Sequence, residues 1–200
     1  MDSELRIVEK PDWVSWDDIH ILLFKAHQQN MAQGMVMRTV NLSGEELKER
    51  VGDGQCFVVL DPNNHLIATG ATKMEVSNKW YAKERVAHLM LEAVLPEYQG
   101  CGVFIPLLQK QLDYAKIHQV NVVILDTAEH NKKMQSILLR KGFRYVSSFA
   151  SQFSKHYSVV MAIWLDHCPY SKWYCKWRFW LQMTKLKLRY KPGKIKRFGI

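Results

Sequence analysis

The sequence has no apolar run long enough to cross a bilayer. Its longest uninterrupted apolar stretch, VVMAIWL, spans residues 159–165, whereas a membrane-spanning helix needs about 20 apolar residues. The first ten residues, MDSELRIVEK, lack the apolar segment of a secretory signal. We therefore expect a cytoplasmic protein, whose only membrane contact would be peripheral, at the inner face of the membrane.

Cysteine is scarce and irregularly spaced. Cys56, Cys101, Cys168 and Cys175 form no C-x-x-C pair, which predicts reduced thiols in place of a disulfide framework. His167 lies close in sequence to two of them, but structural zinc usually uses two short-spaced ligand pairs. We therefore predict that the protein has no metal site.

Two common phosphate-binding patterns are also missing, G-x-x-x-x-G-K-[ST] and G-x-G-x-x-G. What the sequence does contain is the turn QGCGVF, residues 99–104, between an apolar run and a helix-period run. Gly100 and Gly102 suit a tight strand-to-helix turn. The first N–H groups of a helix are unpaired and attract anions, so the same turn is able to bind phosphate. Both interpretations stay open on the residues alone.

Acidic residues are absent from one end of the chain. Residues 167–200 hold ten of the 28 Lys and Arg and no Asp or Glu, so the other 166 residues carry 18 basic and 19 acidic side chains. The net charge of +9 therefore lies in the tail. With 48% apolar residues, we predict one folded domain over residues 1–166 and a basic aromatic extension over 167–200.

Hydrophobic periodicity and turn signals predict a βααβββαβαββ order of elements. Helix starts include a capping box at Ser43 and Glu46. The expected strands are 5–9, 55–60, 65–76, 86–95, 120–126, 144–149 and 157–165. The expected helices are 13–33, 43–52, 103–119 and 131–141. This order predicts a mixed sheet with helices on its faces.

Over residues 5–165 this order resembles the GNAT superfamily of acyl-CoA-dependent N-acyltransferases. The first family motif, (Q/R)-x-x-G-x-(G/A), is matched from Gln99 to Val103 and departs at Phe104, where the family has glycine or alanine. The second motif, N-x-x-(small or apolar)-x-x-L-Y-x-x-x-G-F, has Leu138 in place of its tyrosine. Its matched positions are Asn131, Met134, Ile137, Gly142 and Phe143.

The resemblance implies an α/β (α+β) fold, with a mixed, mostly antiparallel sheet of about seven strands flanked by about four helices. It also implies acetyl-CoA or another acyl-CoA as co-substrate, without a metal. The CoA pyrophosphate would lie on N–H groups of the glycine turn, and the acyl carbonyl at the end of the fourth strand, where the sheet should splay open. The implied CoA-binding residues are Ala93, Val94, Leu95, Gln99, Gly100, Cys101, Gly102, Val103, Phe104 and Asn131.

Glu92 is the candidate general base. It is the only carboxylate in the apolar run HLMLEAVL, on the strand where the family often places a base, and apolar surroundings raise a carboxylate pKa towards neutrality. The alternative is an ion-paired or partly exposed strand residue. Period-2 counting places His88 on the same face as Glu92, where a structural role is more typical of a strand histidine.

The proton donor is not identified by the sequence. Leu138 cannot supply a proton, so Cys101, Tyr98 or solvent remain as candidates. The resemblance implies that the acceptor is a small-molecule or peptide amine. The segment from Gln28 to Arg38 is rich in Met and neutral amides and suits a neutral or partly apolar amine, unless its methionines only fill the core.

The tail predicts an amphipathic helix over 170–188. Trp173, Trp177, Trp180, Leu181, Thr184 and Leu188 would share one arc, with Phe179 and Leu186 opposite. This helix could dock on the domain or on a second subunit, attach to an anionic membrane, or contact nucleic acid. The sequence as a whole predicts an N-acyltransferase. A catalytically degenerate CoA-binding module and an adaptor acting through the tail are the alternatives.

Overall fold

A computed structural model describes residues 5–35, 38–150 and 156–190. The strands in these ranges are β1 (Arg6–Glu9), β2 (Gln55–Leu60), β3 (Leu66–Val76), β4 (Arg85–Val94), β5 (Val122–Ala128), β6 (Arg144–Ala150) and β7 (Tyr157–Trp164). The α-helices are α1 (Trp16–Ala32), α2 (Gly44–Val51), α3 (Phe104–Ile117), α4 (Lys132–Arg140) and α5 (Lys172–Arg189). Two short 3-10 helices are η1 (Arg38–Asn41) and η2 (Pro96–Tyr98).

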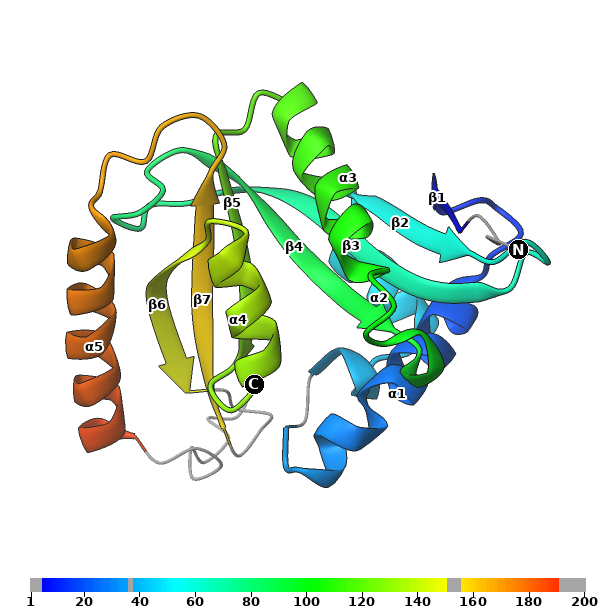
Figure 1. The fold of residues 1–200 in the computed structure, drawn as a ribbon, viewed down its shortest axis with the longest axis horizontal. Coiled ribbons are helices and arrows are strands. Elements are labelled where there is room, and N and C mark those ends of the chain that lie inside the picture. Colours follow the sequence, from blue (N-terminus) through cyan, green and yellow to red (C-terminus); the bar gives the residue numbers. More distant parts are fainter. Residues whose placement is uncertain (1–4, 36–37, 151–155, 191–200) are drawn as a thin grey trace.

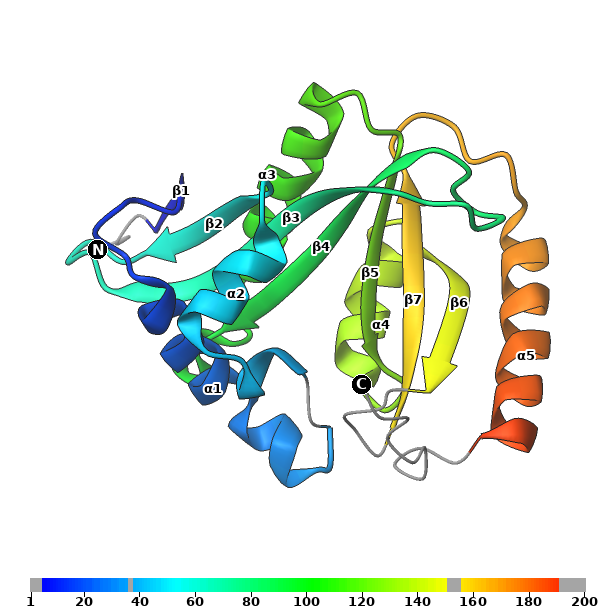
Figure 2. The same cartoon turned by 180° about the vertical axis from the view of Figure 1, so that it is seen from behind.

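The described strands form one sheet in the order β1-β2-β3-β4-β5-β7-β6. All neighbouring pairs are antiparallel except β4 and β5, which confirms the mixed, mostly antiparallel sheet. Helices α3 and α4 cover one face and α1 and α2 the other, as opposite views show (Figures 1 and 2). The four expected helices are present, and α5 adds a fifth within the extension.

Local capping fixes where α1 and α2 begin. The predicted capping box of α2 is confirmed: the Ser43 N–H donates to Glu46 Oε2 at 2.8 Å and the Glu46 N–H to Ser43 Oγ at 3.3 Å. Ser15 and Asp18 form a second box at the start of α1. Each such cap stabilises its helix by about 1 kcal/mol.

Strand β4 contains a bulge at Leu91. This residue has φ +60°, and the β3 register shifts between Thr69 and Ala71, so that Leu91 and Glu92 together oppose Gly70. The extra residue breaks the period of two and turns Glu92 towards α3. The prediction that His88 and Glu92 share one face is therefore wrong, since His88 stays on the face covered by α1 and α2.

Strands β4 and β5 pair over only three residues each, Ala87–Leu89 with Val123–Leu125. Beyond this point β4 continues beside β3 as far as Val94, and β5 beside β7 as far as Ala128. The two strands diverge towards their carboxyl ends (Figure 1). The expected splay of the sheet is present, and it opens a gap at the end of β4.

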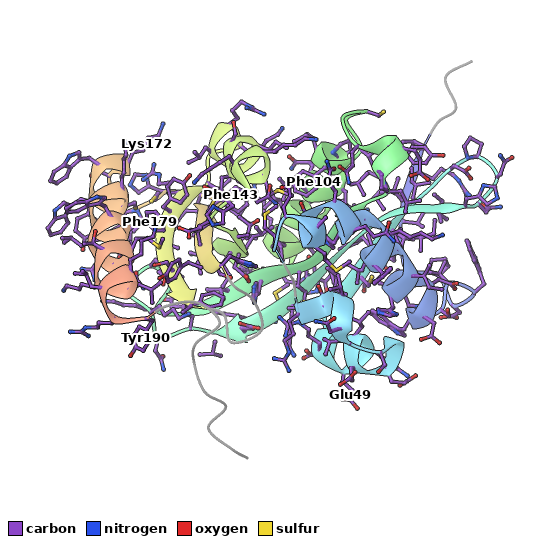
Figure 3. All side chains as sticks on the ribbon, turned by 90° about the horizontal axis from the view of Figure 1, so that it is seen from below. Glu49, Phe104, Phe143, Lys172, Phe179 and Tyr190 are labelled. Atoms are coloured by element: carbon purple, nitrogen blue, oxygen red, sulfur yellow. The ribbon has the colours of Figure 1, made fainter. Side chains whose placement is uncertain are left out.

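Helix α5 docks against the edge strand β6. The Phe179 ring stacks on Tyr145 with centroids 4.6 Å apart, and Figure 3 shows Phe179 pointing from α5 to the sheet. Gln182 Nε2 donates to Ser147 Oγ and to the Ser148 carbonyl, both at 3.0 Å. Cys175 and Met183 on the same side are buried. The part of the extension that forms α5 is therefore docked on the domain through the face opposite the tryptophans.

None of the helices in the described ranges combines the length and apolar character of a bilayer-spanning segment.

Candidate active site

Two cavities meet at the gap between β4 and β5. The first measures about 500 Å³ and is bounded by the end of β4, the glycine turn and α4. The second measures about 480 Å³ and extends over β4, β5 and β7 on the side of His88. Both are lined by His27, Glu92, Asn131 and Met134. Molecules bound in the two cavities would therefore meet beside Glu92.

All predicted site residues except Leu95 and Cys101 line the first cavity. The Leu95 N–H donates to the Ile67 carbonyl at 2.9 Å, and the Cys101 N–H donates to the Tyr98 carbonyl at 3.3 Å. The Cys101 side chain is exposed. The N–H groups of Leu95 and Cys101 are thus used within the protein and are not available to a ligand.

The glycine turn presents unpaired donors to the first cavity. Gly100 and Gly102 have φ +92° and +82°, a backbone conformation that favours glycine. Within the described part of the chain, the N–H groups of Gly100, Gly102 and Val103 have no acceptor. They directly precede the N-terminus of α3, where the helix dipole adds partial positive charge. This arrangement suits a phosphate group.

Three cations of α4 and its C-cap line the same cavity: Lys133, Arg140 and Lys141. The sequence analysis missed them. Their spacing of seven and eight residues places them on one side of a helix, together with Ile137. That signal is weak, because Lys and Arg also occupy most solvated helix faces. Their position beside the glycine turn strengthens the attraction of this cavity for an anion.

A further donor is available at the end of β4. Successive residues of a strand point their N–H groups to opposite sides, and the Leu95 N–H bonds to β3. The Val94 N–H therefore points away from β3, towards the gap. Gln99 Nε2 donates to the Val94 carbonyl at 2.9 Å and holds this backbone in place. The Val94 N–H is thus suited to bind an acyl carbonyl oxygen.

Glu92 lies at the junction of the cavities with one hydrogen-bond partner. Its Oε1 accepts from Gln111 Nε2 at 2.8 Å, while the buried Oε2 has no partner among the described residues. Burial raises the pKa of Glu92 to about 8, against the opposing effect of Gln111. No described cation pairs with it, so the ion-pair alternative is not seen. The carboxyl is mostly protonated at neutral pH and becomes a base above it.

His27 of α1 is a site residue that the sequence analysis did not identify. It is buried, and its Nδ1 accepts a hydrogen bond from Asn30 Nδ2 at 3.1 Å, since an amide nitrogen can only donate. Burial lowers the pKa of His27, partly offset by a hydrogen bond to the Glu92 backbone. The ring is therefore neutral, and both of its nitrogens hold neighbouring groups in place. Nothing in the periodicity of the helix distinguishes it from a core histidine.

His88 is flanked by two carboxylates in the second cavity. Its ring nitrogens lie 3.4 Å from Glu75 Oε1 and 3.3 Å from Asp126 Oδ1. Burial alone would lower the pKa of His88, but hydrogen bonds to Asp126 and Glu75 outweigh it and raise the pKa to about 9. The imidazole is charged at neutral pH. It cannot accept a proton there, so Glu92 is the better candidate base.

The position of the family tyrosine is part of the core. Leu138 has no exposed surface and belongs to a cluster with Leu125, Phe143 and Met161. It lines neither cavity. Of the two protein groups considered as proton donors, Tyr98 lines the first cavity and Cys101 does not.

The segment from Gln28 to Arg38, which runs from the end of α1 into η1, contributes residues to both cavities and to the core. Asn30 lines the first cavity and Arg38 the second, whereas Met35 is buried. Val36 and Met37 lie outside the described residues. In the described ranges, no three His, Cys, Asp or Glu side chains form a cluster able to hold a metal ion.

Comparison with models of protein families identifies one family that matches the chain. Residues 17–143, more than half of the chain, match the family model described as Acetyltransferase (GNAT) family. No curated protein sequence matches the chain significantly.

Solved structures of the same fold are similar to about four fifths of the chain. An acetyltransferase of the GNAT family from Staphylococcus aureus Mu50 has a TM-score of 0.62 at 17% identity, covering 82% of this chain and 100% of that chain. Spermidine N-acetyltransferase from Vibrio cholerae, solved with CoA and spermine, has a TM-score of 0.61 at 21% identity over 82% and 97%. The ribosomal-protein-S18-alanine N-acetyltransferase from Escherichia coli has a TM-score of 0.60 at 15% identity over 82% and 96%. The family match and the shared fold show that this chain belongs to the GNAT acetyltransferases.

Proposed function

We propose that the protein transfers an acetyl group from acetyl-CoA in the first cavity to a primary amine in the second. The observation that carries this proposal is the shared lining of the two cavities, with Glu92 at their junction. The glycine turn and the cations of α4 favour the CoA phosphates in the first cavity. The amine would then approach the thioester through the gap between β4 and β5.

The residues of the junction suggest how the reaction proceeds. The ionised Glu92 removes a proton from the amine, directly or through water, and the neutral amine attacks the acyl carbon. The Val94 N–H binds the carbonyl oxygen as negative charge develops on it. The new C–N bond forms as the C–S bond breaks, and the CoA thiolate takes a proton from Tyr98 or from solvent. The products are an amide and free CoA.

The lining of the second cavity favours one class of acceptor. Its carboxylates Glu75 and Asp126 already bind His88, so they are not free to hold a polycation. Much of the remaining lining is apolar, including Leu89, Leu91, Ile124 and Val160. We therefore favour a small-molecule or peptide amine with one neutral or partly apolar substituent over a polyamine.

Calorimetric titration with acetyl-CoA, followed by turnover assays with a panel of amines, tests the proposal. We expect the wild type to bind acetyl-CoA and to acetylate peptide or apolar primary amines faster than polyamines. The variant Glu92→Gln should bind acetyl-CoA equally well but turn over about 10²-fold more slowly. It should also lose the acidic limb of the pH–rate profile.

Two results would contradict the proposal. If acetyl-CoA and longer acyl-CoAs fail to bind even at millimolar concentration, the first cavity is not a CoA site. Binding without turnover of any amine would support a degenerate CoA-binding module, which the family match does not favour.

A further inference from the structure

Helix α5 has a second aromatic face that no part of the described chain covers. The exposed fractions are 73% for Trp173, 44% for Trp177, 62% for Trp180 and 82% for Leu188. The rings of Trp173 and Trp177 lie parallel, with centroids 6.1 Å apart and an interplanar angle of 5°. We call these four residues the α5 aromatic surface. An exposed aromatic patch of this kind indicates a binding function.

The α5 aromatic surface is exposed even though another face of the same helix packs on the domain. The opposite face already docks on the sheet through Phe179, Cys175 and Met183. At the start of the helix, Tyr170 Oη donates to the Trp80 carbonyl at 2.7 Å. The tryptophans of α5 therefore point to solvent from a helix that is held by its other side.

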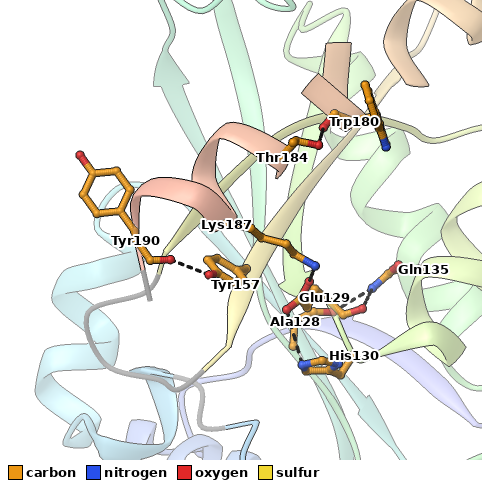
Figure 4. A network of polar contacts seen from close by, with 9 residues as sticks. All are labelled: Ala128, Glu129, His130, Gln135, Tyr157, Trp180, Thr184, Lys187 and Tyr190. Carbon is orange, nitrogen blue, oxygen red and sulfur yellow. Dashed lines mark hydrogen bonds and ion pairs between the residues drawn. The ribbon is translucent and has the colours of Figure 1, made fainter. Parts of the chain in front are cut away.

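The end of α5 is also fixed to the domain. Lys187 Nζ pairs with Glu129 Oε2 at 2.9 Å, and Tyr157 Oη donates to the Tyr190 carbonyl at 2.5 Å (Figure 4). The Thr184 hydroxyl bonds to the Trp180 carbonyl within the helix. Because the helix is already ordered, a partner would bind the α5 aromatic surface without the entropic cost of folding it.

Positive charge borders this surface on both sides. In a helical projection Lys176 and Lys187 lie along one margin and Lys185 along the other, and all three are exposed, with Lys187 also paired with Glu129. Residues 167–200 contain no Asp or Glu. The sequence adds Lys191, Lys194, Lys196 and Arg197, which lie outside the described residues. A central apolar stripe between rows of cations is typical of a helix that lies in a membrane interface.

We propose that the α5 aromatic surface binds an anionic lipid bilayer, with the tryptophans at headgroup depth and the flanking lysines on anionic headgroups. Tryptophan favours this interface because its ring is apolar and its N–H is polar. The lysines complement the charge of the lipids. The attachment is peripheral and reversible, and it is independent of the acetyl transfer proposed above.

Two other partners fit the surface less well. A second copy of this chain, paired around a two-fold axis, would bring the same cations together without an acidic residue of 167–200 to balance them. Nucleic acid needs cations near the centre of its contact and free ring faces for base stacking. Here the centre is apolar, and Trp173 and Trp177 stack on each other.

Sedimentation of the full-length protein with lipid vesicles tests the proposal. We expect co-sedimentation with vesicles of phosphatidylcholine and phosphatidylserine at low salt, little with phosphatidylcholine alone, and release as salt is raised. A variant combining Trp173→Ala, Trp177→Ala and Trp180→Ala should bind at least tenfold more weakly, with an unchanged melting temperature. Trp13 is 60% exposed elsewhere, so Trp13→Ala is the matched control and should bind as the wild type does.

Several outcomes would overturn the proposal. One is a wild type that does not bind anionic vesicles at low salt, and another is a triple variant that binds them as well as the wild type does. Equal binding to neutral vesicles would remove the role of the lysines. If the triple variant instead abolishes a concentration-dependent dimer or the binding of a single-stranded oligonucleotide, and vesicles do not bind, the partner is a second copy or a nucleic acid.

Discussion

Glu92 and His88 lie four positions apart on one strand, and their protonation at neutral pH is the reverse of the ordinary one. Burial keeps the Glu92 carboxyl largely neutral, with a pKa of about 8. His88 is charged, with a pKa of about 9, because Asp126 and Glu75 outweigh its burial. Because the imidazole is already protonated at neutral pH, it cannot act as a base there. It neutralises two acids in the second cavity.

The raised pKa of Glu92 predicts a pH dependence of stability. Between its ordinary value of 4.5 and about 8, the folded protein holds a proton that the unfolded chain has released. The wild type should therefore lose stability as pH rises through this window. Glu92→Gln cannot titrate and does not lose stability in this way. The free energy of unfolding of the variant, relative to that of the wild type, should therefore rise with pH up to about pH 8. Urea unfolding between pH 4.5 and about 8 measures both free energies. If they change with pH in the same way for the two proteins, the pKa of Glu92 is not raised in the folded state.

The raised pKa of His88 predicts the opposite effect of its removal. The stabilisation by the imidazolium is fully present below its ordinary pKa of 6.5 and is lost as pH rises through about 9. His88→Gln should cost about 2 kcal/mol below pH 6.5, because charge-assisted hydrogen bonds to Glu75 and Asp126 are lost. The difference from wild type should shrink between pH 6.5 and about 9 and stay small above that. A difference independent of pH would assign His88 a packing role only.

At the scale of elements, the sequence predicted the features that depend only on residues close together in the chain. The capping box at Ser43 and the glycine turn at Gly100 were found because their chemistry is complete within a few residues. The bulge at Leu91 was not, because a leucine at positive φ has no sequence signature and the extra residue is defined only by the register with β3. One such residue reversed the expected facing of His88 and Glu92.

The bulge makes Gly70 important to the position of Glu92. A Cβ at Gly70 would lie 2.8 Å from Glu92 Oε2 and 2.9 Å from Gln111 Nε2. Gly70→Ala should therefore displace this pair, cost about 1–3 kcal/mol of stability, and lower kcat without weakening acetyl-CoA binding. Urea unfolding, turnover and calorimetry measure the three effects. A normal kcat would show that the position of Glu92 does not matter to the reaction.

Gly102→Ala is the matched change in the other part of the site. At Gly102 the added Cβ meets nothing within 4 Å, but the φ of +82° is strained for alanine. We expect a cost of about 1 kcal/mol and a shift of the turn. Acetyl-CoA should then bind more weakly, whereas kcat at saturation should change little. The reverse pattern, with affinity kept and kcat lost, would contradict phosphate binding at this turn.

At the scale of the whole molecule, α5 joins segments that are distant in sequence. It contacts Trp80 in the loop between β3 and β4 through Tyr174, and Glu129 after β5 through Lys187. The sequence predicted the helix but not its orientation, because both of its faces carry large apolar residues. Which face docks depends on the shape of β6, where Tyr145 receives Phe179.

The two faces of α5 should differ in their effect on stability. Met183→Ala removes a buried side chain and should cost about 2 kcal/mol, lowering the melting temperature. Trp180→Ala alters an exposed side chain and should change stability by less than about 0.5 kcal/mol. Calorimetric melting compares the two variants. If Trp180→Ala were the more damaging change, the tryptophans would be packing residues.

The gap between β4 and β5 also has a consequence for the order of kinetic steps. Since the two cavities share only four of their lining residues, Glu92 among them, both substrates would have room to be bound together. None of the four cysteines lines either cavity, so no thiol is placed to store the acyl group between two half-reactions. Initial-rate plots at several fixed acetyl-CoA concentrations should therefore give intersecting lines, the signature of a ternary complex. Parallel lines would require a covalent carrier.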